Sequence, residues 1–271
     1  MSRQRASLKV IHPSSEADGD PSIVARGLNV WFGDMHVLRD VDVTLHPHRI
    51  NCIVGPSGSG KSTLIRSVNR MNDDLEGFTC TGNVRVGGRD VLDDGTDAVR
   101  LRTEVGMVFQ KPCVFPRSIA ENVLFGVQDQ QRLSREERST LVEENLRAAS
   151  LWREVKHRLD APAGSLSIGQ QQRLCIARTL AVRPRIVLLD EPTSSLDPVS
   201  GRAIEELMGE LKKKYTIVLV THDIRQAWRV ADHLIFLCDG RVIEQGPADQ
   251  LFRSPAHEET RQYLSESYCA C

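Results

Sequence analysis

The sequence predicts an α/β fold in which a mostly parallel β-sheet carries helices on both faces. Four short apolar runs lack the alternation of a half-exposed strand, which indicates strands buried on both faces of a parallel sheet. They are residues 52–54, 186–189, 217–220 and 234–237. Between such runs, apolar residues recur at helical spacing, as at Ile204, Leu207, Met208 and Leu211. Strands that alternate with helices are typical of an α/β sheet.

Two further regions complete the predicted architecture. Residues 23–45 and 84–91 alternate between polar and apolar, which predicts an N-terminal antiparallel β layer. From about 112 to 183 only helical spacing is present, so we expect a helical subdomain inserted into the core, within a domain that covers residues 22–264. Residues 1–21 are polar and rich in turn formers and are expected to be disordered, and residues 265–271 are expected to form a C-terminal tail.

Composition limits the class of protein. The 271 residues are 40% hydrophobic and 26% charged, and the net charge of -1 argues against a nucleic-acid partner. The sequence has neither the ~18 consecutive apolar residues of a membrane span nor the apolar core of a signal peptide, so we expect a soluble cytosolic chain. The 7 cysteines are scattered, which favours reduced thiols, although the Cys269-Ala270-Cys271 end leaves a redox or metal site open.

Residues 55–62 (Gly-Pro-Ser-Gly-Ser-Gly-Lys-Ser), here called the phosphate loop, fit the pattern G-x-x-x-x-G-K-[ST]. They follow an apolar run and precede a helical pattern, which is the required strand–loop–helix context. The glycines allow backbone N–H groups to converge on phosphate oxygens, Lys61 reaches the terminal phosphates, and Ser62 is a ligand for Mg²⁺. We therefore predict ATP and Mg²⁺ as cofactors. The predicted nucleotide contacts are Gly55, Pro56, Ser57, Gly58, Ser59, Gly60, Lys61, Ser62 and Thr63.

A carboxylate pair follows the apolar run 186–189. Asp190 at the end of that strand is placed to hold the metal, and Glu191 is placed to take a proton from an attacking water. An Asp-Glu pair after a strand is also common in a loop that caps a helix. Together with the phosphate loop, the pair predicts a nucleotide hydrolase without specifying its kind.

The segment Leu166-Ser167-Ile168-Gly169-Gln170 lies about 20 residues before Asp190 and opens a helical pattern. It resembles the signature of ABC transporter ATP-binding subunits, and the resemblance extends from Ile23 to about Leu264. It implies the ABC ATPase fold, and it implies that Ser167, Gly169 and Gln170 contact the nucleotide of a second subunit. The family usually has glycine where this chain has Ile168. We expect the signature to keep its contact with ATP, and we expect Ile168 to alter dimer closure or the rate of turnover.

Other matches follow in the family's order, and their roles are implied by the resemblance. Gln110, after the strand-like residues 105–109, resembles the glutamine that touches Mg²⁺ or the attacking water. Asp197 resembles the residue of a loop that crosses the dimer interface, and His222 resembles the histidine that bonds the terminal phosphate. Phe32 resembles the aromatic residue that stacks on adenine, with Trp31 as the competing candidate. The implied catalytic residues are Glu191, His222 and Gln110, and the implied metal ligands are Ser62, Gln110 and Asp190.

The resemblance also implies partners. They are a second copy of the chain, two integral membrane permease subunits that dock beside Gln110 and residues 111–122, and an extracytoplasmic solute-binding protein. The implied location is the cytoplasmic face of the plasma membrane. The segments 109–112, 115–116, 118–119, 121–123, 70–73 and 170–178 closely resemble the phosphate-import ATP-binding subunits. This implies an ATPase that drives phosphate uptake. An importer of a polar amino acid or another oxyanion, a soluble ABC ATPase and a non-hydrolysing regulatory subunit remain alternatives.

Overall fold

The structure is a computed structural model that describes residues 22–127 and 133–269. Its larger sheet has six strands. Neighbouring strands run parallel except at one edge, where the last strand in the chain runs antiparallel to its neighbour. In spatial order they are β10 (Arg241–Pro247), β9 (His233–Cys238), β3 (Ile50–Val54), β8 (Thr216–Val220), β7 (Ile186–Asp190) and β6 (Val105–Val108). The four continuous apolar runs lie in β3, β7, β8 and β9, so their prediction as buried strands is confirmed.

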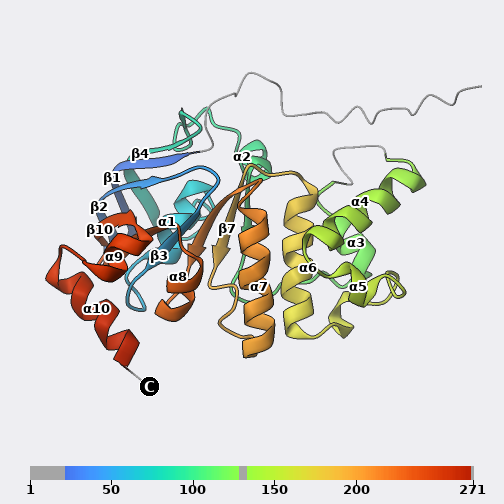
Figure 1. The fold of residues 1–271 in the computed structure, drawn as a ribbon. Helices are drawn as coiled ribbons and strands as arrows, with labels where there is room; N and C mark the ends of the chain where they lie inside the picture. Colours follow the sequence, from blue (N-terminus) through green and yellow to red (C-terminus); the bar gives the residue numbers. More distant parts are fainter. Residues whose placement is uncertain (1–21, 128–132, 270–271) are drawn as a thin grey trace, which may run out of the picture.

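A second sheet of four antiparallel strands lies beside the first (Figure 1). Its spatial order is β2 (Met35–Leu45), β1 (Ile23–Phe32), β4 (Phe78–Val86) and β5 (Arg89–Asp90). The predicted antiparallel β layer is therefore confirmed. Strand β4 starts earlier than the alternation from residue 84 indicated, because residues 78–83 pair with β1 while carrying few apolar side chains.

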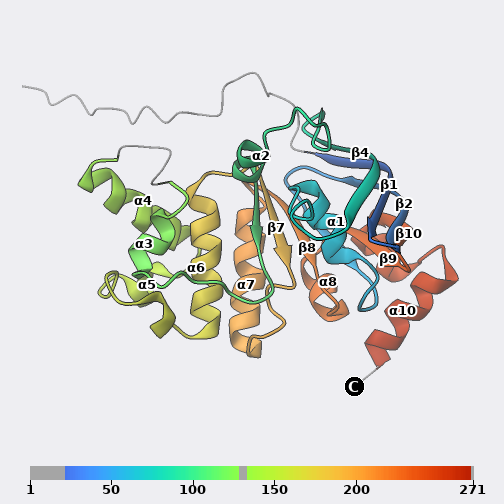
Figure 2. The same ribbon diagram turned by 180° about the vertical axis from the view of Figure 1, so that it is seen from behind.

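The helices connect and cover these sheets. They are α1 (Lys61–Val68), α2 (Ala98–Glu104), α3 (Ile119–Leu124), α4 (Arg135–Ala148), α5 (Trp152–Val155), the 3-10 helix η1 (Ala163–Ser165), α6 (Ile168–Ala181), α7 (Pro198–Leu211), α8 (Ile224–Val230), α9 (Ala248–Arg253) and α10 (Glu258–Cys269). Helix α1 contacts β2 and β4 of the smaller sheet and β7 and β8 of the larger one, so it lies between the two sheets (Figure 2).

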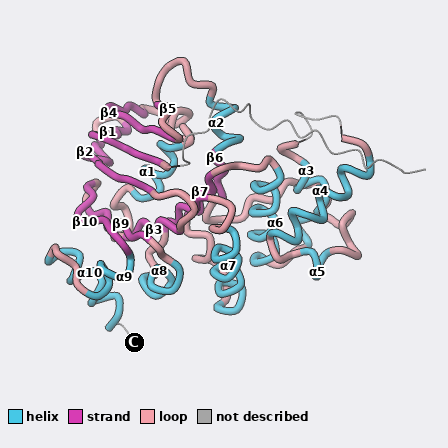
Figure 3. Tube along the Cα trace, turned by 45° about the horizontal axis from the view of Figure 1, so that its top comes forward, coloured by secondary structure: helices cyan, strands magenta, loops and turns pink. Residues whose placement is uncertain are grey.

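Helices α3 to α6 fall between β6 and β7 in the chain and lie on the far side of α7 from the two sheets (Figure 3). They fall within residues 112–183, and the limits of a subdomain there stay a prediction. Helix α10 runs to Cys269 and so includes residues 265–269, which the sequence placed in a tail. The predicted tail 1–21 and residues 270–271 lie outside the described residues.

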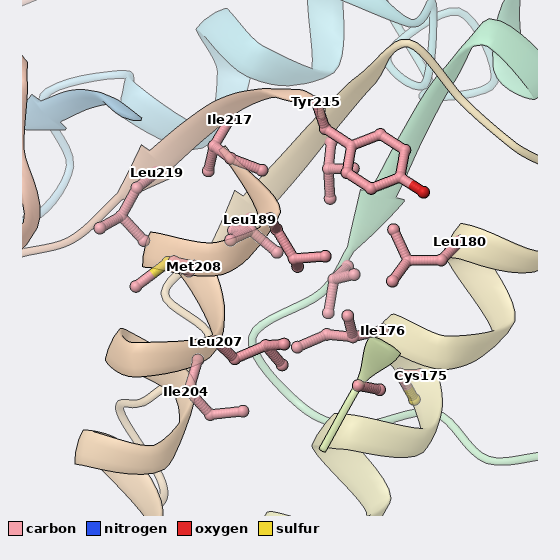
Figure 4. Packing of buried hydrophobic residues seen from close by; sticks show 14 of the residues in the cluster. Cys175, Ile176, Leu180, Leu189, Ile204, Leu207, Met208, Tyr215, Ile217 and Leu219 are labelled. Atoms are coloured by element: carbon pink, nitrogen blue, oxygen red, sulfur yellow. The ribbon is translucent and has the colours of Figure 1, made fainter. Parts of the chain in front are cut away.

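The larger sheet is buried on both faces, and alternate residues of one strand belong to different cores. In β7, Ile186 and Leu188 pack with the smaller sheet and α1, whereas Val187 and Leu189 pack with the helices on the other face. Figure 4 shows the second core, where side chains of β7 and β8 meet those of α6 and α7. This double burial is why the strands carry continuous apolar runs.

None of the helices in residues 22–127 and 133–269 combines the length and apolar character needed to span a bilayer. In the same described part of the chain, histidine, cysteine and acidic side chains do not gather in groups of three or more that could hold a metal ion.

Candidate functional site

The phosphate loop joins the end of β3 to the start of α1, and its glycines are required by close approach. A Cβ atom on Gly55 would lie 1.9 Å from the carbonyl oxygen of Leu237, and one on Gly60, at a φ of +99°, would lie 2.7 Å from Leu38. Only glycine fits such contacts without displacing its neighbours. The loop is therefore seated against β9, with its backbone curled before the first turn of α1.

Lys61 is buried inside this loop. Its Nζ donates to the carbonyl oxygens of Gly55 at 2.8 Å and Pro56 at 2.7 Å. Burial lowers the pKa of Lys61, and the nearby carboxylates of Glu191 and Asp190 act in the opposite direction. The hydroxyl of Ser59 is also buried and has no hydrogen-bond partner among the described residues. The loop thus presents an ammonium group and a free hydroxyl beside a helix N-terminus, a set of groups that suits phosphate.

Asp190, at the end of β7, has both carboxylate oxygens engaged. Ser62 Oγ donates to Oδ1 at 2.7 Å, and an Arg66 guanidinium nitrogen lies 2.9 Å from Oδ2. Asp190 is 2% exposed, so this contact fixes its orientation. The serine and aspartate oxygens that the sequence predicted as metal ligands are thus adjacent, and oxygen donors of this kind fit Mg²⁺. Arg66 was missed, although its spacing of four from Ser62 places both on one face of α1.

Three strand ends converge on the side chain of Glu191. Its Oε2 accepts a hydrogen bond from Gln110 Nε2 at 3.1 Å and lies 3.0 Å from His222 Nδ1. Gln110 follows β6, Glu191 follows β7 and His222 follows β8. The structure therefore brings the three predicted catalytic residues together at one carboxylate oxygen.

The backbone at Glu191 is unusual. Its φ is +46°, a left-handed conformation that a non-glycine residue rarely adopts, and its N–H donates to Val220 O at 2.9 Å. Ser194, which the sequence did not single out, accepts from Gln110 Nε2 at 3.2 Å and donates to the carbonyl of Glu191 at 3.1 Å. This turn directs the carboxylate toward Gln110 and His222.

The signature residues form the start of α6, where Ser167 and Ile168 are exposed and Gly169 is buried. Ser167 caps the helix by accepting from Gln170 N at 3.3 Å, and the Gln170 side chain accepts from Ser167 N at 3.0 Å. This reciprocal pair is a capping box. Ile168 in the first turn is 53% exposed.

The start of α7 lies against the start of α6. A Cβ atom on Gly169 would lie 2.8 Å from Ser200 Oγ, so the two helix ends are in close contact. Asp197 caps α7 by accepting from Val199 N and Ser200 N, each at 3.0 Å, and its hydrogen bonds with Ser200 lower its pKa. The predicted signature and interface residues thus form one surface. Their described hydrogen bonds stay within that surface or reach Arg158 and Glu154, and none reaches the phosphate loop of the same chain.

The two aromatic candidates lie at the end of β1. Phe32 is half-buried, and its ring centroid lies 5.8 Å from that of Phe78 on β4. Trp31 stacks on His36 with 4.4 Å between ring centroids. One face of the tryptophan is thus already occupied, which leaves Phe32 the better adenine candidate of the two.

Sequence similarity to known proteins identifies the family of this chain. Residues 38–194 match the family model described as ABC transporter. This chain belongs to the ABC transporter family. The predicted resemblance and the ABC ATPase fold are therefore confirmed.

Several ABC relatives match almost the whole chain. It is 48% identical over 245 residues to the phosphate import ATP-binding protein PstB of Salinibacter ruber, which covers 90% of this chain and 98% of that protein. It is 46% identical over 262 residues to phosphate import ATP-binding protein PstB 1 of Yersinia pestis, with 97% of each covered. Among solved structures, an ATP-bound bacterial Atm1-family ABC exporter matches with a TM-score of 0.77 and 25% identity. That match covers 93% of this ABC chain and 42% of the exporter chain.

Proposed function

We propose that this chain is the ATP-hydrolysing subunit of an importer of inorganic phosphate. The observation that carries the ATPase is the meeting of Gln110, Glu191 and His222 at one carboxylate oxygen, next to the phosphate loop. Phosphate as the solute is supported by the two relatives named as phosphate import proteins, because both match at nearly full length.

Each part of the proposed site has a chemical task. Lys61 and the N–H groups of the phosphate loop hold the phosphates of ATP, and Phe32 stacks on the adenine. Ser62, Asp190 and Gln110 hold Mg²⁺, which neutralises charge on the phosphates when it is bound.

The proton path involves the residues after β6, β7 and β8. Glu191 accepts a proton from the attacking water, a task that suits a positioned carboxylate. His222 donates a hydrogen bond to the terminal phosphate, and its present contact with Glu191 keeps the ring beside the site. Gln110 orients the water.

We further propose that the working unit is a homodimer. Ser167, Gly169, Gln170 and Asp197 lie at the adjoining starts of α6 and α7, where Ser167 and Asp197 are exposed, and the described hydrogen bonds of these residues do not involve their own phosphate loop. Two helix N-termini meet there, and such ends favour anions. In a two-fold dimer, this surface of one copy completes the nucleotide site of the other.

Docking on two integral membrane permease subunits and an extracytoplasmic solute-binding protein completes the proposed assembly, at the cytoplasmic face of the membrane. An aromatic and basic cluster near Gln110 supports it. The rings of Phe115 and Phe125 lie 4.1 Å apart, and the Arg178 guanidinium lies 4.4 Å above the Phe115 ring. Phe109 and Phe125 are 36% and 41% exposed, so part of each ring is accessible to a docking partner.

Glu191→Gln tests this function. The amide cannot take a proton from water, so we expect ATP turnover to fall by about 10²–10⁴-fold while nucleotide binding persists. Turnover is measured in the complex with its permeases, and phosphate uptake is measured in cells that depend on this chain. The exposed Glu206→Gln on α7 is the matched control and should behave as wild type.

Three outcomes would contradict the proposal in different ways. Absence of turnover by the wild-type complex would exclude the motor. Wild-type turnover in Glu191→Gln would remove the assignment of the base. Uptake of another solute, with phosphate uptake unaffected by loss of the chain, would remove phosphate as the cargo.

A further inference from the structure

A buried glutamine links the two helices that follow β7 and β8. Gln226 on α8 is 1% exposed, and α8 lies beside α7 (Figure 1). Its Nε2 donates to the hydroxyl of Thr193 at 2.8 Å and lies 3.4 Å from a carboxylate oxygen of Glu205 on α7. An ionised carboxylate only accepts hydrogen bonds, so the contact with Glu205 fixes which end of the amide is the donor. The glutamine thus joins α8 to α7 and to the loop between β7 and α7.

The segments that Gln226 joins carry two facing residues of the candidate site. Thr193 is two residues after Glu191, in the same turn. His222 lies immediately before Asp223, which caps α8 and accepts from the backbone N–H of Gln226 at 3.0 Å. At the site, Glu191 Oε2 and His222 Nδ1 are 3.0 Å apart. Through its side chain and its backbone, Gln226 therefore connects the turn of Glu191 to the residue next to His222.

Glu205 gives this link a rigid support. Its carboxylate accepts two hydrogen bonds from the Arg229 guanidinium, from Nε at 2.8 Å and from a terminal nitrogen at 2.6 Å. A guanidinium paired in this way restricts the carboxylate in distance and in plane. The Oε1 atom of Gln226 is buried and has no hydrogen-bond partner among the described residues. An unpaired buried acceptor destabilises a fold, and such local conflicts are expected mainly at functional sites.

We propose that Gln226 is a positioning residue for ATP hydrolysis. Its hydrogen bond to Thr193 sets the placement of Glu191 relative to His222. This inference rests on the proposed ATPase function. Loss of the bond frees the turn that carries the carboxylate from the helix that follows the histidine, while Lys61 keeps its contacts in the phosphate loop. Small displacements of reacting groups have large effects on rate, so turnover should fall with little change in nucleotide affinity.

The test uses Gln226→Met, Thr193→Val and the double variant, each in the full chain in complex with its permeases. Both changes nearly keep the size of the side chain and remove its polar atoms. The matched control is Thr179→Val on α6, because Thr179 is also half-buried and its hydroxyl donates to the carbonyl of Cys175 in its own helix at 3.0 Å. ATP turnover gives kcat and KM. The affinity for a non-hydrolysable ATP analogue with Mg²⁺ and the unfolding temperature of the nucleotide-free chain are also measured.

We expect Gln226→Met and Thr193→Val each to lower kcat by about three- to tenfold, the effect of one lost neutral hydrogen bond, and to change analogue affinity by less than about twofold. The double variant should lose no more than the larger single loss, because both changes break the same bond. Unfolding temperatures should stay near the wild-type value, since Gln226→Met also removes the unpaired Oε1. Thr179→Val should behave as the wild type in every measurement.

The inference fails if either single variant that folds keeps the wild-type kcat, whatever its unfolding temperature. Additive losses in the double variant would show that the two side chains act separately. A loss of analogue affinity as large as the loss of kcat would assign Gln226 to the fold of the site and not to the chemical step. Should Gln226→Met fail to fold, Thr193→Val decides, since that side chain is only half-buried. If the wild-type complex does not hydrolyse ATP, the proposed function is wrong instead.

Discussion

At the scale of single residues, the least expected contact is the one between Arg66 and Asp190. Ser62 and Arg66 each take one oxygen of this carboxylate, so its plane is fixed before any metal arrives. A pair of this kind contributes through geometry as well as charge, since the guanidinium is planar. We therefore assign Arg66 the task of orienting the proposed metal carboxylate.

Arg66→Met is expected to lower the affinity for Mg-ATP by about fivefold, which corresponds to about 1 kcal/mol for a partly exposed ion pair. The reason is that Asp190 loses its fixed orientation. Nucleotide affinity is measured with Mg²⁺ and again with a chelator. The loss should appear only with Mg²⁺, and Arg66→Lys should be intermediate. An equal loss in both conditions would show that Arg66 acts on the fold of the loop instead.

At the scale of elements, β9 begins with a buried histidine. His233 is 6% exposed, its ring meets that of His46 edge to face at 4.5 Å, and its Nε2 has no partner in the described residues. Burial lowers the pKa of His233 to about 4, and His46 and Arg49 act in the same direction. The unfolded chain, with a histidine pKa near ~6.5, therefore binds a proton that the folded chain excludes.

The lowered pKa of His233 makes the stability of the fold depend on pH. Neutral His233 leaves stability undiminished above pH ~6.5, and stability is lost as the pH falls from there toward about 4. Between pH 7 and 5 we expect His233→Leu to remove about 1–2 kcal/mol of the wild-type decline in unfolding free energy. Denaturant titrations at several pH values measure it. The control His157→Leu, at an exposed position, should show the same fall in unfolding free energy as the wild type. If His233→Leu also shows the full fall, His233 is not its cause.

Elements with strong local patterns could be predicted from the sequence, and those fixed by distant partners could not. Strands β3, β7, β8 and β9 are apolar throughout because both of their faces are buried. The edge strand β10 was missed, since its residues are mostly half-buried or exposed and carry no such pattern. The short helix α2 was missed for a similar reason.

The candidate site divides in the same way. Residues such as Lys61 and Glu191 were found because they belong to contiguous motifs with a known chemical task. Ser194 was not, because its importance arises from its contact with Gln110, which lies far from it in the sequence.

At the scale of the whole molecule, the proposed homodimer assigns a partner to the surface formed by the starts of α6 and α7. Its proposed nucleotide contacts, Ser167 and Asp197, are exposed. Ile168 stands on that surface and replaces the glycine of the family. In the proposed dimer the completed site is a property of two chains, with ATP between them.

We expect Glu191→Gln to convert from monomer to dimer on addition of Mg-ATP, because bound nucleotide persists when hydrolysis is blocked. Molar mass in solution, by light scattering on a sizing column, measures this. Adding Lys61→Ala to the same variant should prevent the dimer, and adding Ile168→Gly should let it form at lower ATP concentration. A chain that stays monomeric at saturating ATP, with or without its permeases, would refute the shared site.

The strand order of the larger sheet has a consequence for how the chain is made. Strand β3, which leads into the phosphate loop, is synthesised early, but its two neighbours β8 and β9 are among the last strands to leave the ribosome. Pairing across so long a separation is slow to form. A nascent chain arrested before His233 has the complete phosphate loop sequence and no strand to seat it. We therefore expect the growing polypeptide to acquire its capacity for nucleotide only near the end of translation, once β9 can pair with β3.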